Sequence, residues 1–299
     1  MYPENLNTRS SGFSAYAVTH NTEGSIMNKM KSGITGFIPK GADFFQTLES
    51  YAQIGYKAFE GAGYMFALPG DPKDNAKRVR DMGLELITIS TNVQNGNQPD
   101  VKELIQKANT VGVNRVTIYH SSATAWRFAD RPELPDYEEI KKEIQTIDKL
   151  GKALAGEGLS LVFHNHDQEF LTCYDGVPLF WRLAAECPEL KFELDLGWVK
   201  YAGWDPALLI RQLGSRISVL HVKDYIPGEN YEYKPLRTVT VPRYCAPGAG
   251  VVDLYACFKA ACEAGIEWAI IEQDMQYQLT HKESVQAAYY NMKDTGFVI

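Results

Sequence analysis

The feature that most constrains the fold is a unit that recurs along the chain from Gly33 onward. Each unit has an amphipathic stretch with helical spacing, a glycine where that stretch ends, and a short β-branched run that closes in polar residues. The expected strands are ITGFI (34–38), YKAFE (56–60), LELITIS (84–90), RVTIYH (115–120), LSLVFH (159–164), LKFELD (190–195), ISVLHV (217–222) and WAIIEQ (268–273). Strands that alternate with helices predict a parallel sheet covered by those helices.

The stretches between the strands have apolar residues three and four apart and end at glycine, as capped helices do. They include DFFQTLESYAQIG, DPKDNAKRVRDMG, VKELIQKANTVG, YEEIKKEIQTIDKLGKALAGEG, DPALLIRQLG, LYACFKAACEAG and SVQAAYYNMKDTG. Eight units predict an α/β fold that closes into a (β/α)8 TIM barrel over residues 34–299, with an N-terminal extension over residues 1–33. An open doubly wound sheet is the alternative, but no GxGxxG or GxxxxGK[ST] motif follows a strand.

Composition narrows the classes of partner. The formal charge is −7 and no Lys/Arg-rich run is present, so a nucleic-acid partner is not expected. No stretch approaches the roughly 18 apolar residues of a membrane span, and the N-terminus lacks the apolar region of a signal peptide, so we expect a cytoplasmic protein without a membrane partner. The 5 cysteines form no CxxC pair, which indicates free thiols, with Cys257 and Cys262 facing the core from a helix.

Polar side chains gather where the expected strands end, which is where the active site of an α/β barrel lies. These positions hold Glu60, Ser90 or Thr91, His120, His164 with His166, Asp195, His221 and Glu272. Asp195, His221 and Glu272 end three consecutive strands, and a buried carboxylate is costly unless a positive group meets it. We therefore expect one divalent metal ion there, of Mn, Co, Zn or Mg. A lone histidine such as His120 can equally be a hydrogen-bonded structural residue, and Glu60 can cap a helix or pair with a lysine.

The segment FHNHDQEF (163–170) follows the fifth expected strand directly. Alternate residues of a strand face the same side, so His164 and His166 point the same way. If His164 faces the barrel axis, it completes the metal site beside Asp195, and His166 is placed to meet substrate. Glu169, in the following loop, is the rival fourth ligand, and the sequence leaves both alternatives open.

Six segments resemble, in their order and spacing, the xylose isomerase-like barrels. They are GYKAFEGAG, FHNHDQEF, ELDLGWVKYAGWDP, ISVLHVKDY, APGAGVVDL and AIIEQD, and they are similar to the sugar phosphate isomerase/epimerase group, which includes inosose dehydratase and the ketose 3-epimerases. The resemblance implies one divalent metal held by Glu, Asp, His and Glu from strands five to eight, with Asp195, His221 and Glu272 in the last three places. His164 stands where that group usually has its first glutamate, and Trp198 where some epimerases have a substrate-binding histidine, so both departures indicate a different substrate.

The resemblance implies a sugar isomerase or epimerase that abstracts a proton next to a carbonyl through a metal-stabilised enediolate. We expect Glu272 as one acid/base and Glu169 or His166 as the second. The residues expected to contact the sugar substrate are Glu60, His120, Trp198 and Lys223. Lys223 can instead pair with Glu272 or form a surface salt bridge.

Two alternative functions are compatible with the same fold: a keto-inositol dehydratase and an enzyme that processes 3-keto-glycosides. An apurinic endonuclease is less expected, because the third strand ends in TISTN without a histidine and the net charge is negative. A non-catalytic sugar-binding barrel is disfavoured because the carboxylates of Asp195 and Glu272 are retained. The family resemblance also implies a homo-oligomer.

The segment 224–252 is too long for an ordinary loop after a strand, so we expect it to cover the substrate. Its several tyrosines suit sugar faces, and a subunit contact explains them equally well. Within it, PGAG (247–250) is interpreted as a turn, with backbone N–H groups that could instead approach a phosphate. Asp205 and Asp224 are expected in surface loops.

Overall fold

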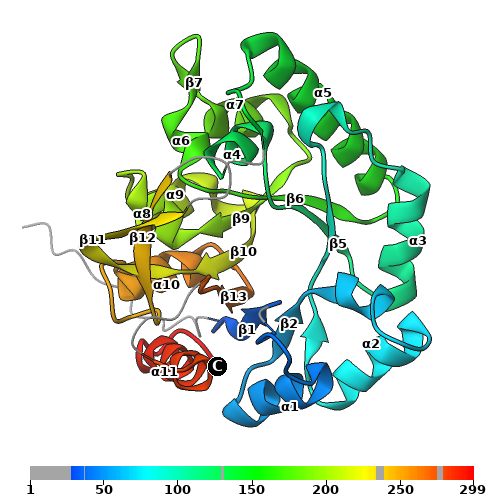
Figure 1. Ribbon diagram of the computed structural model, residues 1–299, viewed down its shortest axis with the longest axis vertical. Helices are drawn as coiled ribbons and strands as arrows, with labels where there is room; N and C mark the ends of the chain where they lie inside the picture. The colour runs from blue at the N-terminus through cyan, green and yellow to red at the C-terminus, as the bar shows by residue number, and fades with distance from the viewer. Residues whose placement is uncertain (1–27, 37, 129–130, 234–238, 275–278) are drawn as a thin grey trace, which may run out of the picture.

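A computed structural model describes residues 28–36, 38–128, 131–233, 239–274 and 279–299. Its main sheet is parallel, with the order β3-β2-β1-β13-β10-β9-β6-β5-β4. The strands are β1 (Lys31–Thr35), β2 (Ala58–Glu60), β3 (Glu85–Leu86), β4 (Ile89–Thr91), β5 (Arg115–Ile118), β6 (Ser160–His164), β9 (Lys191–Asp195), β10 (Ile217–Val222) and β13 (Trp268–Ile271). The two end strands, β3 and β4, are consecutive pieces of one extended segment, so the sheet curls round into a barrel (Figure 1). The expected TIM-barrel fold is confirmed.

Two strands differ from the expectation. The first runs over Lys31–Thr35 rather than 34–38, and it pairs with β2 and β13. The third is interrupted after Leu86, where the carbonyl of Thr88 accepts a hydrogen bond of 3.0 Å from the backbone N–H of Ala62. The predicted extension falls mostly on residues 1–27, which lie outside the described residues, so it stays a prediction.

In the described residues, eight helices surround the barrel (Figure 1). They are α1 (Phe44–Ile54), α2 (Pro72–Asp81), α3 (Val101–Val111), α5 (Tyr137–Ala155), α7 (Leu179–Glu186), α9 (Pro206–Leu213), α10 (Leu254–Glu263) and α11 (His281–Asp294). All except α7 begin at an Asp or Thr whose side chain accepts a backbone N–H of the first turn, which satisfies a donor that has no partner inside the helix. The helix α7 lacks such a cap and was not among the helices expected from the sequence.

Short elements cover the end of the barrel at which the strands finish. They are η1 (Ala62–Phe66), η2 (Gln94–Gly96), α4 (Ser122–Arg127), α6 (Gln168–Leu171), the strand pair β7 (Cys173–Tyr174) and β8 (Val177–Pro178), and α8 (Leu196–Tyr201). The turn η3 (Gly214–Arg216) instead leads into β10 at the other end. Because α4, α6 and α8 follow β5, β6 and β9 directly, they fix the polar residues at those strand ends.

The barrel interior and the helix layer are both apolar. Ala58, Ile87, Val219, Trp268 and Ile270 form one buried cluster with side chains from β2, β10, β13 and the residues between β3 and β4, and a larger cluster lies between the strands and the helices. All five cysteines are free, as expected. Cys257 and Cys262 are buried on α10, which confirms their predicted place in the core.

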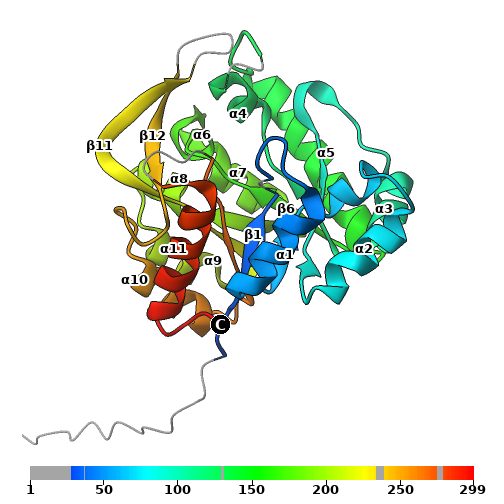
Figure 2. The same cartoon turned by 60° about the horizontal axis from the view of Figure 1, so that its bottom comes forward.

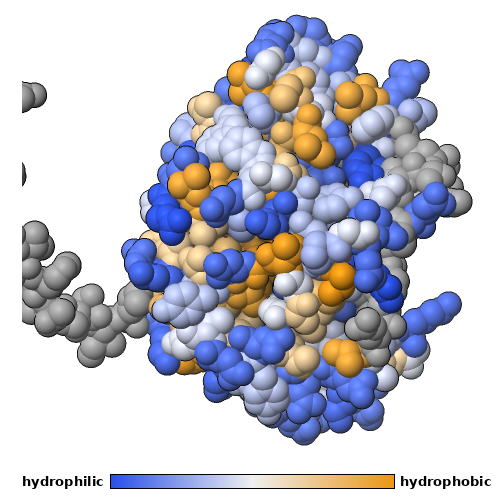
Figure 3. Space-filling model, turned by 90° about the vertical axis from the view of Figure 1, so that its left-hand side faces the viewer, coloured by the Kyte–Doolittle hydropathy of each residue, from blue (hydrophilic) through white to orange (hydrophobic). Residues whose placement is uncertain are grey.

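The outer surface is mixed in polarity. On the face drawn in Figure 3, apolar patches alternate with polar side chains, so this face does not by itself mark a subunit interface. No helix in the described parts of the chain is long and apolar enough to cross a membrane. The expected homo-oligomer stays a prediction.

The long segment after β10 forms an antiparallel hairpin, β11 (Asp224–Tyr233) and β12 (Val239–Cys245). The hairpin stands at the same end of the molecule as α4 and α6 (Figure 2). Val241 and Tyr244 from β12 pack with Trp198 in a small buried cluster. Part of this segment, residues 234–238, lies outside the described residues.

Asp224 anchors the hairpin, so the prediction of a surface-loop aspartate is wrong. It is fully buried, and its carboxylate accepts backbone N–H bonds of 2.8–3.0 Å from Gly248, Gly250, Val251 and Val252. A Cβ on Gly250 would lie 2.3 Å from Asp224 Oδ1, so this approach requires glycine. These N–H groups already hold an internal carboxylate, which leaves the PGAG turn no free donors at Gly248 and Gly250 for a phosphate. Asp205, in contrast, is exposed as expected.

Replacement of Asp224 by alanine is expected to lower the free energy of unfolding by about 2 to 3 kcal/mol, because several backbone N–H groups lose their acceptor. Urea unfolding followed by circular dichroism measures this loss. Asp224→Asn, which keeps one carbonyl oxygen as acceptor, should lose less. An alanine variant as stable as wild type would show that water replaces the carboxylate at no cost.

Candidate functional site

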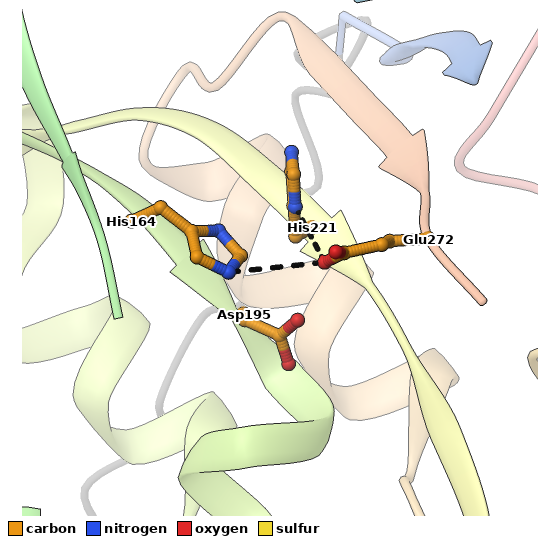
Figure 4. A group of neighbouring side chains, drawn as sticks. All are labelled: His164, Asp195, His221 and Glu272. Carbon is orange, nitrogen blue, oxygen red and sulfur yellow. Dashed lines mark hydrogen bonds and ion pairs between the residues drawn. The ribbon is translucent and has the colours of Figure 1, made fainter. Parts of the chain in front are cut away.

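Four side chains from four neighbouring strands meet at the end of the barrel. His164 ends β6, Asp195 ends β9, His221 lies on β10, and Glu272 follows β13. One potential ligand atom from each lies within 4.8 Å of the others. In Figure 4 the rings of His164 and His221 both point toward the Glu272 carboxylate, with Asp195 beside them. The structure thus groups His164, and not Glu169, with the other three residues.

A second carboxylate layer lies beside the histidines and was partly missed from the sequence. Glu60 Oε2 is 2.6 Å from His221 Nε2, and Glu193 Oε1 is 3.0 Å from the same nitrogen. Glu193 is fully buried and was not among the predicted site residues. Its position two residues before Asp195 on β9 could have revealed it, because residues two apart on a strand face the same side.

Lys223 brings a fixed positive charge into the site. It is 1% exposed, which excludes the surface salt bridge considered from the sequence. Its Nζ lies 3.1 Å from Glu272 Oε2, 3.4 Å from Asp195 Oδ2 and 3.0 Å from Asp274 Oδ2, so the alternative of a pairing with Glu272 is present, and the expected contact with substrate stays a prediction. The burial of Lys223 works against its charged form, but these carboxylates raise its pKa, and it stays an ammonium.

The carboxylates of the site differ in their electrostatics. Burial raises the pKa of Asp195 to about 7, although Lys223 opposes this shift. Burial alone would also raise the pKa of Glu272, but Lys223, His164 and His221 together hold it well below its usual value. Burial lowers the pKa of His164. Burial also works against the charged form of His221, but Glu193, Glu60 and Glu272 raise its pKa well above the usual value. The site therefore combines an ionised Glu272 with a neutral imidazole at His164, which is the form in which histidine binds a metal.

Aromatic rings form the wall of the site on the side of β5, β6 and β9. The ring of His166 lies 4.8 Å from His164, 5.1 Å from His120 and 5.4 Å from Trp198. Among the described residues, His166 Nδ1 and Trp198 Nε1 are buried without a hydrogen-bond partner. Two donor or acceptor atoms are thus available on this wall.

Glu169 lies behind this wall, and its carboxylate is occupied. It is fully buried and accepts hydrogen bonds from the hydroxyls of Ser121 and Thr124 and, at 2.7 Å, from the backbone N–H of His166. Burial raises its pKa to about 7. These contacts connect Glu169 with the backbone of His166 rather than with the four-residue group, and its predicted catalytic role stays a prediction.

A neighbouring buried carboxylate, Glu143 on α5, accepts from the backbone N–H and the hydroxyl of Ser122 at the start of α4. Burial raises its pKa from 4.5 to about 7. Because the folded-state pKa is above the unfolded value, this group favours folding below pH 4.5, and its contribution is lost as the pH rises from 4.5 to 7. The contribution of Glu143 to the free energy of unfolding is therefore more favourable at acidic than at neutral pH.

The Glu143→Gln variant keeps the hydrogen bonds without a charge and should reduce this pH dependence, by up to roughly 3 kcal/mol between pH 4.5 and 8. Urea unfolding at several pH values measures the difference. Glu138→Gln, an exposed glutamate on the same helix, is the control. If the free energy of unfolding changes with pH in the same way for Glu143→Gln and wild type, the buried Glu143 does not titrate as expected.

A cavity of about 600 Å³ opens beside the four-residue group, toward β1, β2 and β4. Its lining includes Glu60, His221 and Glu272 from the site, together with Thr35, Tyr64, Thr88, Ser90 and Tyr119, whose hydroxyls can bind a polar ligand. Of the predicted substrate contacts, Glu60 lines this cavity, whereas His120, Trp198 and Lys223 are not among its lining residues. Tyr64 and Tyr119 were not predicted: Tyr64 lies in η1, and Tyr119 directly precedes His120, which was the residue selected at the end of that expected strand.

The chain is similar to named sequence relatives and to solved structures. An inosose dehydratase of Clostridium beijerinckii is 26% identical over 171 residues, which are 54% of this chain and 56% of the relative, so the chain spans about half the length of the curated relative. A sugar phosphate isomerase/epimerase from Parabacteroides distasonis has a TM-score of 0.65 at 20% identity and covers 91% of this chain and 96% of its own. The IolI protein, solved with a bound zinc atom, has a TM-score of 0.66 at 18% identity, covering 89% of this chain and 98% of its own.

The sequence model of one family, described as xylose isomerase-like TIM barrel, matches residues 48–289. This span includes most of the barrel and all four residues of the group described above. The chain therefore belongs to the xylose isomerase-like TIM barrel family.

Proposed function

We propose that the protein is an enzyme that binds one divalent metal ion and abstracts a proton next to the carbonyl of a sugar or a cyclic polyol. The observation that carries this proposal is the group of His164, Asp195, His221 and Glu272, whose ligand atoms lie within 4.8 Å of one another beside a cavity of about 600 Å³. Metal-binding sites and reactive carboxylates share this location at the strand ends of α/β barrels.

The residues fit a divalent cation. Asp195 Oδ2 is buried and has no hydrogen-bond partner among the described residues. Asp195, Glu272, Glu60 and Glu193 together bring four carboxylates, against which Lys223 supplies one fixed charge. Two imidazole nitrogens and two carboxylate oxygens suit Zn, Mn or Co, and Mg less well.

A bound cation would act as a Lewis acid on the substrate carbonyl and so acidify the neighbouring C–H bond. Lys223 and the histidines keep Glu272 ionised against the effect of its burial, and Glu272 lines the cavity, which supports it as the residue that accepts the proton. His166, with its unpartnered Nδ1, is the second proton-transfer group of the proposal, and Glu169 fixes the backbone of His166. The hydroxyl-bearing cavity wall suits a polyhydroxylated substrate.

Two outcomes can follow the common proton abstraction. Return of the proton to the same or the neighbouring carbon gives an epimerase or isomerase, in line with the sequence-based expectation. Loss of a hydroxyl from the next carbon gives a dehydratase, and the five curated relatives, all named inosose dehydratase, favour a keto-inositol as its substrate.

Incubation in D₂O with Mn²⁺ or Co²⁺, followed by proton NMR, separates these outcomes. Ketoses that gain deuterium next to the carbonyl without losing water would identify an isomerase or epimerase. A keto-inositol that loses water would identify the dehydratase. If neither ketoses, keto-inositols nor 3-keto-glycosides exchange a proton with the metal-loaded protein, the proposed reaction is wrong.

A further inference from the structure

One layer of the barrel interior carries a carboxyl group where three other strands carry apolar residues. The residue two positions before the polar strand end is Ala58 on β2, Val219 on β10 and Ile270 on β13, and all three are fully buried in one apolar cluster. On β9 the corresponding residue is Glu193, which is also fully buried. A carboxylate in an apolar layer is costly unless it has a specific partner.

The partners of this carboxylate are the two histidines of the proposed metal site. Glu193 Oε1 lies 3.0 Å from His221 Nε2 and 3.3 Å from His164 Nδ1. Glu60 Oε2 approaches the same His221 Nε2 at 2.6 Å. Glu193 therefore faces one nitrogen of each imidazole, and Glu60 faces the same nitrogen of His221.

The opposite nitrogens of both rings face Glu272. His221 Nδ1 lies 2.9 Å and His164 Nε2 3.8 Å from Glu272 Oε2, as the dashed lines of Figure 4 show. Each imidazole thus has one nitrogen toward Glu193 and the other toward the four-residue group. A neutral imidazole carries one N–H donor and one lone pair, and an ionised carboxylate can only accept.

We infer that Glu193 and Glu60 are positioning residues for the metal, which leave the lone pairs of His164 Nε2 and His221 Nδ1 for the cation. Glu60 accepts the N–H group of His221 Nε2. Glu193 Oε1 and His164 Nδ1 lie 3.3 Å apart and have no hydrogen-bond partner among the described residues, so Glu193 is the acceptor assigned to a His164 Nδ1–H group when the cation is bound. The inference rests on the proposed function, since it assigns a role relative to the same site. Carboxylates placed in this way orient a ligating histidine and increase its basicity. Glu193 has this role although it does not line the cavity.

Metal affinity tests the inference without reference to activity. Titration with Mn²⁺, with free Mn²⁺ followed by electron paramagnetic resonance, should show about 10- to 100-fold weaker binding for Glu193→Gln and for Glu60→Gln than for wild type. The d–d absorption of bound Co²⁺ should also change, because the imidazoles are no longer held in one tautomer. Glu143→Gln, which replaces another buried carboxyl group, one that bonds Ser122 rather than a histidine ring, is the matched control and should bind as wild type does. Circular dichroism confirms that each variant is folded.

The outcomes distinguish the inference from the proposed function. If Asp195→Asn loses the metal while Glu193→Gln and Glu60→Gln bind it as tightly as wild type, the inference is wrong and the metal site stands. If wild type binds neither Mn²⁺ nor Co²⁺, the metal site and the inference both fall. If wild type binds two ions and Glu193→Gln loses one of them, Glu193 is a ligand itself, and its positioning role is overturned.

Discussion

Asp195→Asn is expected to lose bound metal and to reduce turnover by about 1,000-fold or more, because a Lewis acid contributes several kcal/mol to such a proton transfer. The substitution removes the charge while it keeps an oxygen in place. Asp195 Oδ1 accepts the backbone N–H of Trp198 at 2.7 Å, and an asparagine can make the same bond. The start of α8 should therefore remain intact. Elemental analysis of protein purified without chelator, together with the D₂O exchange rate, measures both effects.

Asp205→Asn is the matched control for this variant. Asp205 is exposed and caps α9 through a bond of 3.0 Å to the backbone N–H of Leu208, and asparagine caps a helix nearly as well as aspartate. Metal content and turnover should remain at the wild-type level. If the Asp195→Asn variant keeps its metal content and its turnover, Asp195 is not a ligand of the metal.

Lys223→Met is expected to lower the free energy of unfolding by about 3 to 5 kcal/mol in chelator, because it leaves buried carboxylates without their cation. Lys223 Nζ contacts Asp195, Glu272 and Asp274 at 3.0–3.4 Å, and the side chain is 1% exposed. A divalent cation bound by Asp195 and Glu272 would replace part of the missing positive charge. Added Mn²⁺ should therefore stabilise Lys223→Met more than it stabilises wild type.

Urea unfolding in chelator and in Mn²⁺ gives the four free energies that this comparison needs. Lys259→Met, an exposed lysine on α10, is the control and should change stability by less than about 0.5 kcal/mol. Equal losses for the two lysine variants, or a loss at Lys223 that Mn²⁺ does not reduce, would contradict the electrostatic account of the site.

The barrel could be predicted from the sequence because its signals are local. Helical spacing, capping residues and β-branched runs are each contained within one unit, and the strand ends place Asp195, His221 and Glu272 together by the geometry of the fold alone. Alternate residues of a strand face the same side, so Lys223, two residues beyond His221, is buried on the same side as His221.

The parts that were missed depend on contacts between distant segments. The role of Asp224 requires the backbone of residues 248–252 to turn back onto it. The choice of His164 over Glu169 depends on α6, which places the Glu169 carboxylate against Ser121 and Thr124. Glu193 was missed for a different reason: it lies inside a strand, where a charged residue is usually assigned to the solvent face.

The central claim is that His164, Asp195, His221 and Glu272 hold one divalent cation. Anomalous X-ray scattering from crystals soaked in Mn²⁺ tests it most directly. The account predicts one anomalous peak at bonding distance from His164 Nε2, His221 Nδ1 and carboxylate oxygens of Asp195 and Glu272. No peak at this group, or a peak bound by Glu60 and Glu193 instead, would contradict it.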